Sequence, residues 1–295
     1  MSLFDAYWTE ALRGLMPWAA PFFSAVSMLG SANFYVALVA IGYWTLDKRA
    51  SRRAALLLLA SSCSNYWLKV SLRNPRPPPS NWLPGTEASN YSLPSGHAQT
   101  STTIWGWLSL KGGEAWIWGL SLALILLIGL SRVYIGVHWL GDVLLGWAVG
   151  AVLLLLVASR LEEWASSVTS RYGADTLYLG LVVLGLVSMV LTEFLFPVNL
   201  AGLEDNFGGN GGFMIGLGVG LMLERRYVNF EVPESGERRR RVLRAVLGLA
   251  LILMVMAGLS MVLPSEIYWL RAARYALSVI TAMFIWPFIF TRLNL

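Results

Sequence analysis

The chain alternates between long hydrophobic runs and short polar segments, and this pattern predicts a bundle of membrane-spanning helices. Residues 177–195 are almost uncharged, and residues 245–263 and 275–290 contain no charged side chain. A helix needs roughly 20 apolar residues to cross a bilayer, and about nine spans are predicted on this basis. They cover residues 31–46, 54–72, 97–110, 115–132, 138–159, 176–196, 212–224, 243–263 and 272–291. The expected fold class is all-α, a polytopic helical membrane protein.

The N-terminal residues have a different pattern. Residues 2–16 place Phe4, Trp8 and Leu12 on one helical face, which predicts an amphipathic helix lying in the membrane interface. Residues 18–30 are apolar but short, so we expect them to be interfacial or re-entrant. The predicted organisation is an interfacial segment (1–30), a core (31–159) and a C-terminal transmembrane extension of about four helices (160–295).

Composition supports the membrane assignment. Apolar residues make up 56% of the chain and charged residues only 13%, against about 25% in an average soluble domain. The net charge is +5, but the basic residues stand next to hydrophobic runs, so nucleic-acid binding is not expected. The single cysteine, Cys63, excludes a disulfide within the chain. No cleavable signal peptide is expected at the N-terminus.

The distribution of basic residues predicts the orientation of the spans. One set of predicted loops holds 15 of the 22 Lys and Arg residues, and the positive-inside rule assigns these loops to the cytoplasm. The opposite side has seven, among them Lys69, Arg76 and Arg132. Basic residues on the side that topology disfavours need a reason of their own, and they point to a functional site on the extracytoplasmic face of the cell membrane.

Three short segments on that outer side carry candidate chemistry. They are Lys69 followed by Arg76-Pro77, then Pro94-Ser95-Gly96-His97, and finally Ser131-Arg132 followed by His138 and Asp142. The chain has only two histidines, and both lie in these segments. Histidine is the side chain suited to proton transfer near neutral pH. The segments therefore predict a site for a charged substrate that reacts.

The spacing of His138 and Asp142 places both on one face of a helix. A carboxylate there can accept the Nδ1–H of the imidazole and leave Nε2 free to attack. Taken alone, the pair could also be a structural contact between two residues of one helix. The 94–97 segment is typical of a helix start, where backbone N–H groups and a glycine favour an anion, although alone it could be an ordinary turn.

The cations of the segments suit phosphate. Arg76 and Arg132 can bind phosphate oxygens through two parallel hydrogen bonds, and Lys69 supplies a point charge. Arg73 lies one helical turn after Lys69 and is either a further phosphate contact or a solvated charge. No cluster of carboxylates suggests a Mg²⁺ site, so fixed cations are expected to act without a metal or cofactor.

Together the segments resemble the signature motifs of the type 2 phosphatidic acid phosphatase superfamily. The family pattern is Lys, six residues, Arg-Pro; then Pro-Ser-Gly-His; then Ser-Arg, five residues, His, three residues and Asp. This chain matches each position in order, and the resemblance covers residues 31–155. The superfamily includes integral lipid phosphatases, undecaprenyl diphosphate phosphatases, glucose-6-phosphatase, soluble acid phosphatases and vanadium haloperoxidases.

The resemblance implies a phosphohistidine on His138, with Asp142 orienting it and His97 protonating the leaving group. It implies phosphate binding by Lys69, Arg76, Ser95, Gly96 and Arg132. The expected function is a membrane-embedded lipid phosphatase that hydrolyses a lipid phosphomonoester or diphosphate. Candidate substrates are polyprenyl diphosphate, phosphatidylglycerol phosphate and phosphatidic acid. Membrane members commonly have six spans with a hydrophobic helix before the first interfacial segment, and this leading span is not expected here.

Two other functions remain open from the sequence. A phosphotransferase would pass the phosphate from His138 to an acceptor lipid or sugar instead of water. A lipid transporter or scaffold would give a role to residues 160–295, which the core pattern does not explain. A stripe of small residues in this extension, Gly212, Gly216 and Gly220, predicts close helix packing within the chain or in a homodimer.

Overall fold

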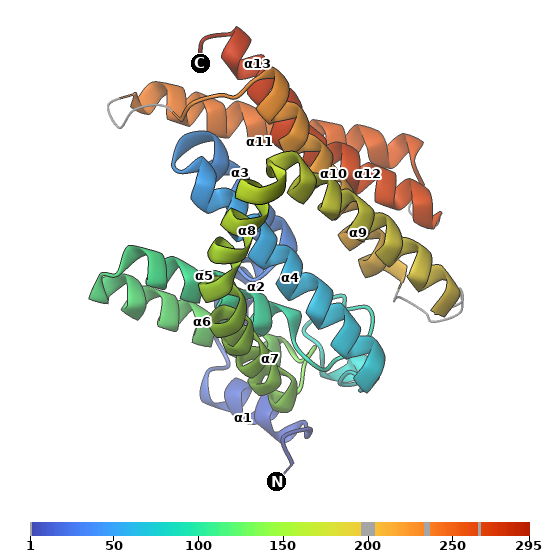
Figure 1. The fold of residues 1–295 in the computed structure, drawn as a ribbon. Helices are drawn as coiled ribbons and strands as arrows, with labels where there is room; N and C mark the ends of the chain where they lie inside the picture. Colours follow the sequence, from blue (N-terminus) through green and yellow to red (C-terminus); the bar gives the residue numbers. More distant parts are fainter. Residues whose placement is uncertain (1, 196–203, 233–236, 265–266) are drawn as a thin grey trace. The chain divides into compact units, whose positions relative to one another are not determined.

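A computed structural model describes residues 2–195, 204–232, 237–264 and 267–295. Within these ranges every regular element is helical, which confirms the all-α prediction (Figure 1). The chain divides into two compact units. Unit 1 comprises Met1–Tyr35 and Leu56–Arg160, and unit 2 comprises Val36–Ala55 and Leu161–Leu295. Residues 36–55 therefore group with the C-terminal part of the chain, whereas the sequence analysis placed them in the core.

Unit 1 holds most of α4 (Lys48–Leu72). Its further helical elements include α1 (Tyr7–Leu15), α2 (Ala20–Met28), α5 (Gly96–Gly112), α6 (Ala115–Ile135), α7 (Leu140–Leu153) and the 3-10 turn η1 (Pro79–Asn81). A short π-helical turn, η2 (Leu154–Ala158), continues α7.

Helix α5 lies at the centre of unit 1 and packs against both α6 and α7. Two glycines of α7 permit the close approach. A Cβ atom on Gly146 would lie 2.7 Å from the Ser95 carbonyl oxygen, and one on Gly150 would lie 2.5 Å from the Gln99 carbonyl oxygen. Small residues let helix backbones approach each other in this way. The first turn of α5 is thereby held against α7.

Helix α1 is fastened to the C-terminal end of α6. The Thr9 hydroxyl is buried and donates to the Val133 carbonyl oxygen at 2.9 Å. Arg13 donates to the carbonyl oxygens of Tyr134 and Ile135 at 2.8 and 3.0 Å. The last carbonyls of a helix lack partners within the helix, and a cation there also interacts favourably with the helix dipole. The predicted amphipathic helix thus forms part of unit 1, and its place in a membrane interface stays a prediction.

Helix α4 leads into the longest irregular segment of unit 1. It ends where Arg73 adopts a φ of 50°, in the left-handed region that commonly terminates helices. The chain then runs to Ser95 with η1 as its only regular element. Four prolines within residues 75–79 exclude a helix over that stretch, because proline lacks the backbone N–H that a helix needs.

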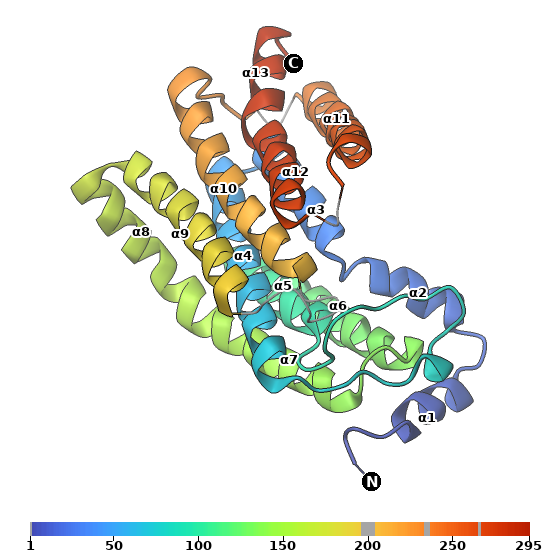
Figure 2. The ribbon, with the colours of Figure 1, turned by 90° about the vertical axis from the view of Figure 1, so that its right-hand side faces the viewer.

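Unit 2 contains the remaining helices and most of α3 (Ala32–Thr45). They are α8 (Ser159–Tyr172), α9 (Ala174–Leu195), α10 (Glu204–Tyr227), α11 (Arg238–Val262), α12 (Tyr268–Ile280), the π-helical turn η3 (Thr281–Ile285) and α13 (Trp286–Arg292). Helix α10 packs between α9 and α12, as Figure 2 shows.

The glycine stripe of α10 faces α12. A Cβ atom on Gly212 would lie 2.2 Å from the Ala272 carbonyl oxygen, and one on Gly216 would lie 2.5 Å from that of Ala276. The stripe therefore serves packing within the chain, one of the two alternatives that the sequence left open. A homodimer through this stripe stays an untested prediction.

A buried ion pair closes the other end of α10. Glu224 is 1% exposed, and its carboxylate accepts hydrogen bonds from Lys48 Nζ at 2.6 Å, the Tyr43 hydroxyl at 3.2 Å and the Phe230 backbone N–H at 3.0 Å. A buried carboxylate is tolerated only when it is paired and hydrogen-bonded in this way. The cluster joins the turn between α3 and α4 to the end of α10 within unit 2.

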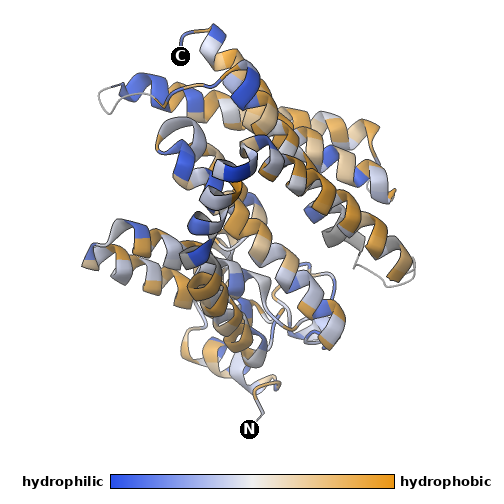
Figure 3. Cartoon of the chain, viewed as in Figure 1, coloured by the Kyte–Doolittle hydropathy of each residue, from blue (hydrophilic) through white to orange (hydrophobic). Residues whose placement is uncertain are grey.

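Four helical segments of the described chain are long and apolar enough to cross a membrane, or five if the bent pair α2–α3 is one span. They are α6, α9, α11 and the continuous stretch from α12 to α13. Figure 3 shows α9 and most of α11 as hydrophobic, with a hydrophilic start to α11. Of the nine predicted spans, those in α4, α5, α7 and α10 fall outside this set. Of these helices, α4, α5 and α7 each carry residues of the three motifs.

Candidate active site

The three motifs meet in unit 1. The first lies at the end of α4 and in the following loop, the second at the start of α5, and the third across the end of α6 and the start of α7. The Ser95 backbone N–H donates to the Asp142 carbonyl oxygen at 2.9 Å, which ties the second motif to the third. Close packing of α5 on α7 thus brings residues far apart in sequence into one group.

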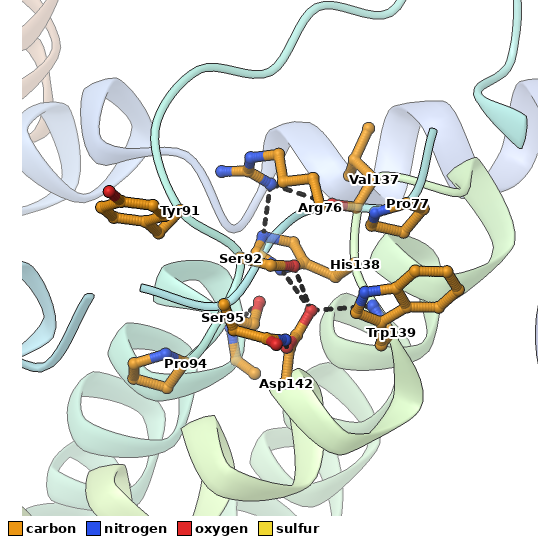
Figure 4. A network of polar contacts seen from close by, with 12 residues as sticks. Arg76, Pro77, Tyr91, Ser92, Pro94, Ser95, Val137, His138, Trp139 and Asp142 are labelled. Atoms are coloured by element: carbon orange, nitrogen blue, oxygen red, sulfur yellow. Dashed lines mark hydrogen bonds and ion pairs between the residues drawn. The ribbon is translucent and has the colours of Figure 1, made fainter. Parts of the chain in front are cut away.

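His138 and Asp142 form a buried hydrogen-bonded pair at the centre of the group. His138 Nδ1 lies 3.2 Å from Asp142 Oδ2, and the two residues are 2% and 0% exposed. The Trp139 backbone N–H donates to the same oxygen at 2.8 Å, as does the Ser92 hydroxyl (Figure 4). A carboxylate that accepts the Nδ1–H fixes the tautomer in which Nε2 carries the lone pair. The lone pair of His138 therefore lies on Nε2, on the side of the ring away from Asp142.

Arg76 lies directly beside that nitrogen. Its Nη1 donates to His138 Nε2 at 3.1 Å and to the Val137 carbonyl oxygen at 2.9 Å (Figure 4). Its Nε and Nη2 donate to the Ser89 carbonyl oxygen at 3.0 and 2.8 Å. The guanidinium is thereby held from both sides, with one edge next to His138 Nε2.

Lys69 is linked to Arg76 through Asn90. Its ammonium group donates to Asn90 Oδ1 at 2.8 Å and to the Tyr91 carbonyl oxygen. The same Oδ1 accepts from Arg76 Nη2 at 3.2 Å. Asn90 has a φ of 59°, a left-handed conformation that asparagine tolerates better than most residues. One amide oxygen therefore holds both cations of the first motif.

Arg132 has an unsatisfied donor. Its Nη1 donates to Ser27 Oγ of α2 at 2.5 Å, whereas its Nε is buried and has no hydrogen-bond partner among the described residues. Buried donors are nearly always hydrogen-bonded, so an unpaired guanidinium N–H in a site calls for an acceptor from a ligand. A phosphate oxygen has the matching charge and geometry.

The second motif forms the start of α5. Ser95 is 0% exposed and caps the helix, its hydroxyl oxygen accepting from the Ala98 N–H at 3.5 Å. Gly96 is constrained by α4, because a Cβ atom there would lie 3.1 Å from Asn65 Oδ1. The His97 imidazole forms no hydrogen bond with any residue that the structure describes. Its ring nitrogens are thus available to a substrate.

Arg73 lies apart from this group. Its side chain is exposed, and its Nε donates to the Val70 carbonyl oxygen at 3.0 Å, at the end of its own helix. The structure places it as a cation on the last turn of α4, where it satisfies a terminal carbonyl group. A phosphate contact from Arg73 stays a prediction without support from these contacts.

The charges of the group are unbalanced. Three basic side chains, Lys69, Arg76 and Arg132, share this group with a single carboxylate, Asp142, and Lys69 and Asp142 are buried. Burial lowers the pKa of Arg76 to about 10, so it stays charged at neutral pH. Buried charges are stable when an opposite charge compensates them. A dianion such as a phosphate group supplies the missing negative charge.

The same environment keeps His138 neutral. Burial lowers the pKa of His138 well below its usual range, and the positive charge of Arg76 lowers it further. Only the neutral imidazole has a lone pair on Nε2. The pKa shift therefore favours the nucleophilic form at neutral pH.

Three residues of the group were not identified from the sequence. Ser92 contacts Asp142, Asn90 contacts Lys69 and Arg76, and Ser27 contacts Arg132. None of them follows a periodic pattern, and two lie in the irregular segment before α5. For Asn90 and Ser92, the one available signal in the sequence was their nearness to Pro94, the first residue of the second motif.

Among the described residues there is no group of three or more His, Cys, Asp and Glu side chains that could hold a metal ion.

Two family models match the chain. Residues 50–165 match the model described as the PAP2 superfamily, and residues 209–295 match the one described as "PAP2 superfamily phosphatase, transmembrane extension". The first match contains all three motifs. The fold and the site thus define a multi-pass helical membrane protein of the PAP2 superfamily. Within that superfamily, this chain belongs with the members that carry the C-terminal transmembrane extension.

Three curated relatives illustrate the range of similar proteins. Lipid phosphate phosphatase delta of Arabidopsis thaliana is 29% identical over 60% of this chain and 46% of its own length. Sphingosine-1-phosphate phosphatase 1 of Mus musculus is 28% identical over 77% of this chain and 56% of its own length. Phosphatidylglycerophosphatase B of Bacillus subtilis is 27% identical over 48% of this chain and 74% of its own length. The chain spans about half the length of the first two.

Proposed function

We propose that this chain is an integral membrane lipid phosphatase that hydrolyses a phosphomonoester or diphosphate of a lipid. The observation that carries the proposal is the group of three basic side chains near His138, with Arg76 at Nε2 and Asp142 at Nδ1 of the ring. A nucleophilic nitrogen beside basic side chains that outnumber the carboxylates suits attack on a phosphate, because the same cations stabilise the charge of the transition state.

The proposed reaction has two steps. In the first, Nε2 of His138 attacks phosphorus, the bond from phosphorus to the leaving oxygen breaks, and His97 donates a proton to that oxygen. In the second, His97 removes a proton from a water molecule, whose oxygen attacks phosphorus, and the bond from Nε2 to phosphorus breaks to release inorganic phosphate. Asp142 stabilises the positive charge that His138 carries while it is phosphorylated.

Arg76 has a direct part in the first step. Because Arg76 Nη1 donates to Nε2, attack requires that this hydrogen bond be exchanged for one to a phosphate oxygen. Arg132 Nε and Lys69 would bind further oxygens, and the N–H groups at the start of α5 favour an anion in the same place. Fixed cations would supply the charge stabilisation that a metal ion supplies elsewhere, so the reaction is proposed to need no metal.

The substrate is proposed to be a phosphorylated lipid. The names of the relatives support this class, since they refer to a lipid phosphate, to sphingosine-1-phosphate and to phosphatidylglycerophosphate. A site at the ends of apolar helices lets a headgroup enter while its tails stay in the bilayer. We retain polyprenyl diphosphate, phosphatidylglycerol phosphate and phosphatidic acid as candidates and add sphingosine-1-phosphate.

The site is proposed to face away from the cytoplasm. The excess of Lys and Arg in the opposite set of loops supports this orientation through the positive-inside rule. It requires α4, α5, α7 and α10 to cross the membrane with the apolar helices, giving about nine spans and an interfacial α1. Cysteine labelling from outside intact cells tests it: a single cysteine at exposed Ser80 should react, and one at exposed Lys111 should not.

Phosphate release from a panel of substrates tests the activity. The purified protein should release phosphate from at least one of the four lipids, and His138→Ala should abolish release and the acid-labile phosphoenzyme. Lys69→Ala should lower the rate strongly, whereas Lys111→Ala, the same change at an exposed lysine, should leave it unchanged. Full activity of His138→Ala would contradict the proposal, and loss of wild-type activity with a chelator would contradict its metal-free form.

Two alternatives give different results in the same experiment. A phosphotransferase would form the phosphoenzyme but release little phosphate until an acceptor lipid or sugar is added, and mass spectrometry would then find the phosphorylated acceptor. A transporter or scaffold would bind or move lipid without forming a phosphoenzyme. The arrangement of His138 and Asp142 favours the enzymes, because transport needs no oriented nucleophile.

A further inference from the structure

Ser92 is held in one position by contacts on both its backbone and its side chain. It is 0% exposed, and its backbone N–H donates to the Asn74 carbonyl oxygen at 2.9 Å. Its hydroxyl donates to Asp142 Oδ2 and lies 3.3 Å from His138 Nδ1 (Figure 4). The side chain therefore contacts both members of the central pair at once. It comes from the loop before α5 and not from the helix start that carries the pair.

The hydrogens at this contact can be assigned by counting donors. A serine hydroxyl has one hydrogen and two lone pairs, and an ionised carboxylate can only accept. The hydroxyl hydrogen of Ser92 therefore points to Asp142, which leaves an oxygen lone pair facing His138 Nδ1. That lone pair can only be used if Nδ1 carries a hydrogen. Asp142 Oδ2 at 3.2 Å and Ser92 Oγ at 3.3 Å then share the same Nδ1–H.

We infer that Ser92 is a positioning residue for the nucleophile: it fixes the Asp142 carboxylate and, with it, holds His138 in the tautomer whose Nε2 is free to attack phosphorus. Asp142 Oδ2 and Ser92 Oγ both accept from the Nδ1–H of His138. Two acceptors restrict rotation of the imidazole ring about its Cβ–Cγ bond more than the carboxylate alone would. In this role Ser92 does not contact the substrate. The expected effect of Ser92 on the reaction rate rests on the proposed function, whereas its expected effect on the imidazole ring does not.

Rate measurements test the role with matched variants. Ser92→Ala removes the hydroxyl, and Ser92→Cys fills the same space with a poor donor and acceptor. Both should lower kcat by about tenfold to hundredfold, the range expected for losing one hydrogen bond to a charged group, with KM changed less than about twofold. Ser80→Ala, the same change at an exposed position of the same loop, should leave both constants unchanged.

Two results of these measurements would overturn the inference. Wild-type kcat in Ser92→Cys would show that Ser92 only fills space. A change in KM without a change in kcat would place Ser92 in substrate binding. In both cases the hydrogen bonds to the pair would have no effect on the nucleophile.

A second measurement needs no substrate. Nitrogen-15 NMR of the imidazoles reports the tautomer of each ring, and assignment is simple because the chain has two histidines. His138 should be in the Nδ1–H form in the wild type, and its Nδ1 resonance should shift in Ser92→Ala, because one of the two acceptors of the Nδ1–H is then lost. Identical ring spectra would refute the role of Ser92. A protein that hydrolyses none of the lipids but shows this change would refute the proposed function and leave the positioning role intact.

Discussion

The charge of Asp142 can be separated from its geometry by one substitution, Asp142→Asn. The donors from His138, Trp139 and Ser92 all converge on Oδ2, so an asparagine whose amide oxygen takes that place keeps an acceptor facing these donors. Among the residues that the structure describes, Asn74 Nδ2 is the donor that approaches Oδ1, at 3.5 Å. The variant should therefore keep the fold and the tautomer of His138. The variant loses the negative charge of the carboxylate, which faces the His138 ring when phosphorylation makes that ring cationic.

The distance between the two groups sets the size of the loss. His138 Nδ1 and Asp142 Oδ2 are 3.2 Å apart. At an effective dielectric constant near 20, opposite unit charges at that separation attract each other by about 5 kcal/mol. The three nearby cations already compensate part of the carboxylate charge, so we expect a loss of about 3–5 kcal/mol in the transition state. This corresponds to a fall of about a hundredfold to several thousandfold in the rate of phosphohistidine formation.

Rapid-quench measurement with a substrate carrying radioactive phosphate reports that rate directly. The phosphoenzyme survives base and is lost in acid, which identifies the adduct as phosphohistidine. Asp175→Asn is the control, because Asp175 is 65% exposed and lies outside the active site. A rate within about tenfold of the wild type in Asp142→Asn would show that geometry alone accounts for the role of Asp142 and would refute the electrostatic reasoning.

Two further predictions follow from the same site. The acid limb of kcat/KM should lie below the ordinary histidine pKa of about 6.5, because burial and the charge of Arg76 lower the pKa of His138, and the neutral nucleophile is lost only when the pH falls through that lowered value. Gly30→Ala would place a Cβ atom 2.5 Å from Ile128 Cγ2 and 2.7 Å from His97 Cδ2, so activity should fall at least tenfold. A Cβ atom on Gly14 would meet no described atom within 4 Å apart from its own helix backbone and chain neighbours, so Gly14→Ala should leave activity unchanged.

The helices of unit 2 were well predicted because long apolar runs define them. The predicted spans at 176–196 and 243–263 agree closely with α9 and α11. The span predicted at 212–224 starts eight residues later than α10, because glycines at its beginning lower helix propensity. The structure shows why they are tolerated there: Gly212 approaches the backbone of α12. Helix α8 was not predicted, because its charged residues interrupt the apolar run that marks a membrane span.

The candidate active site could be predicted from the sequence only where its residues are separated by a few positions on a helix. The motif residues on helix ends, such as His138 and Asp142, stand four residues apart and lie where helical geometry requires. Ser92 and Asn90 could not be placed, because the loop from residue 73 to 95 has no repeating pattern that fixes its path. Its position depends on Arg76 and Lys69, whose side chains bind loop carbonyl oxygens. Such contacts follow from the fold and are not encoded by any single segment.

The contacts of Arg76 connect the resting arrangement of the site to the proposed reaction. Its donor to His138 Nε2 needs the lone pair on that nitrogen, so this hydrogen bond and the low pKa of His138 favour the same neutral form. The hydrogen bonds to Ser89, Asn90 and Val137 hold the guanidinium when the donor turns to a phosphate oxygen. Because the cation does not have to travel, freeing the nucleophile and binding the phosphate become one small movement. A substrate phosphate is then the group that releases Nε2 for attack, and the nucleophile stays hydrogen-bonded until that phosphate is bound.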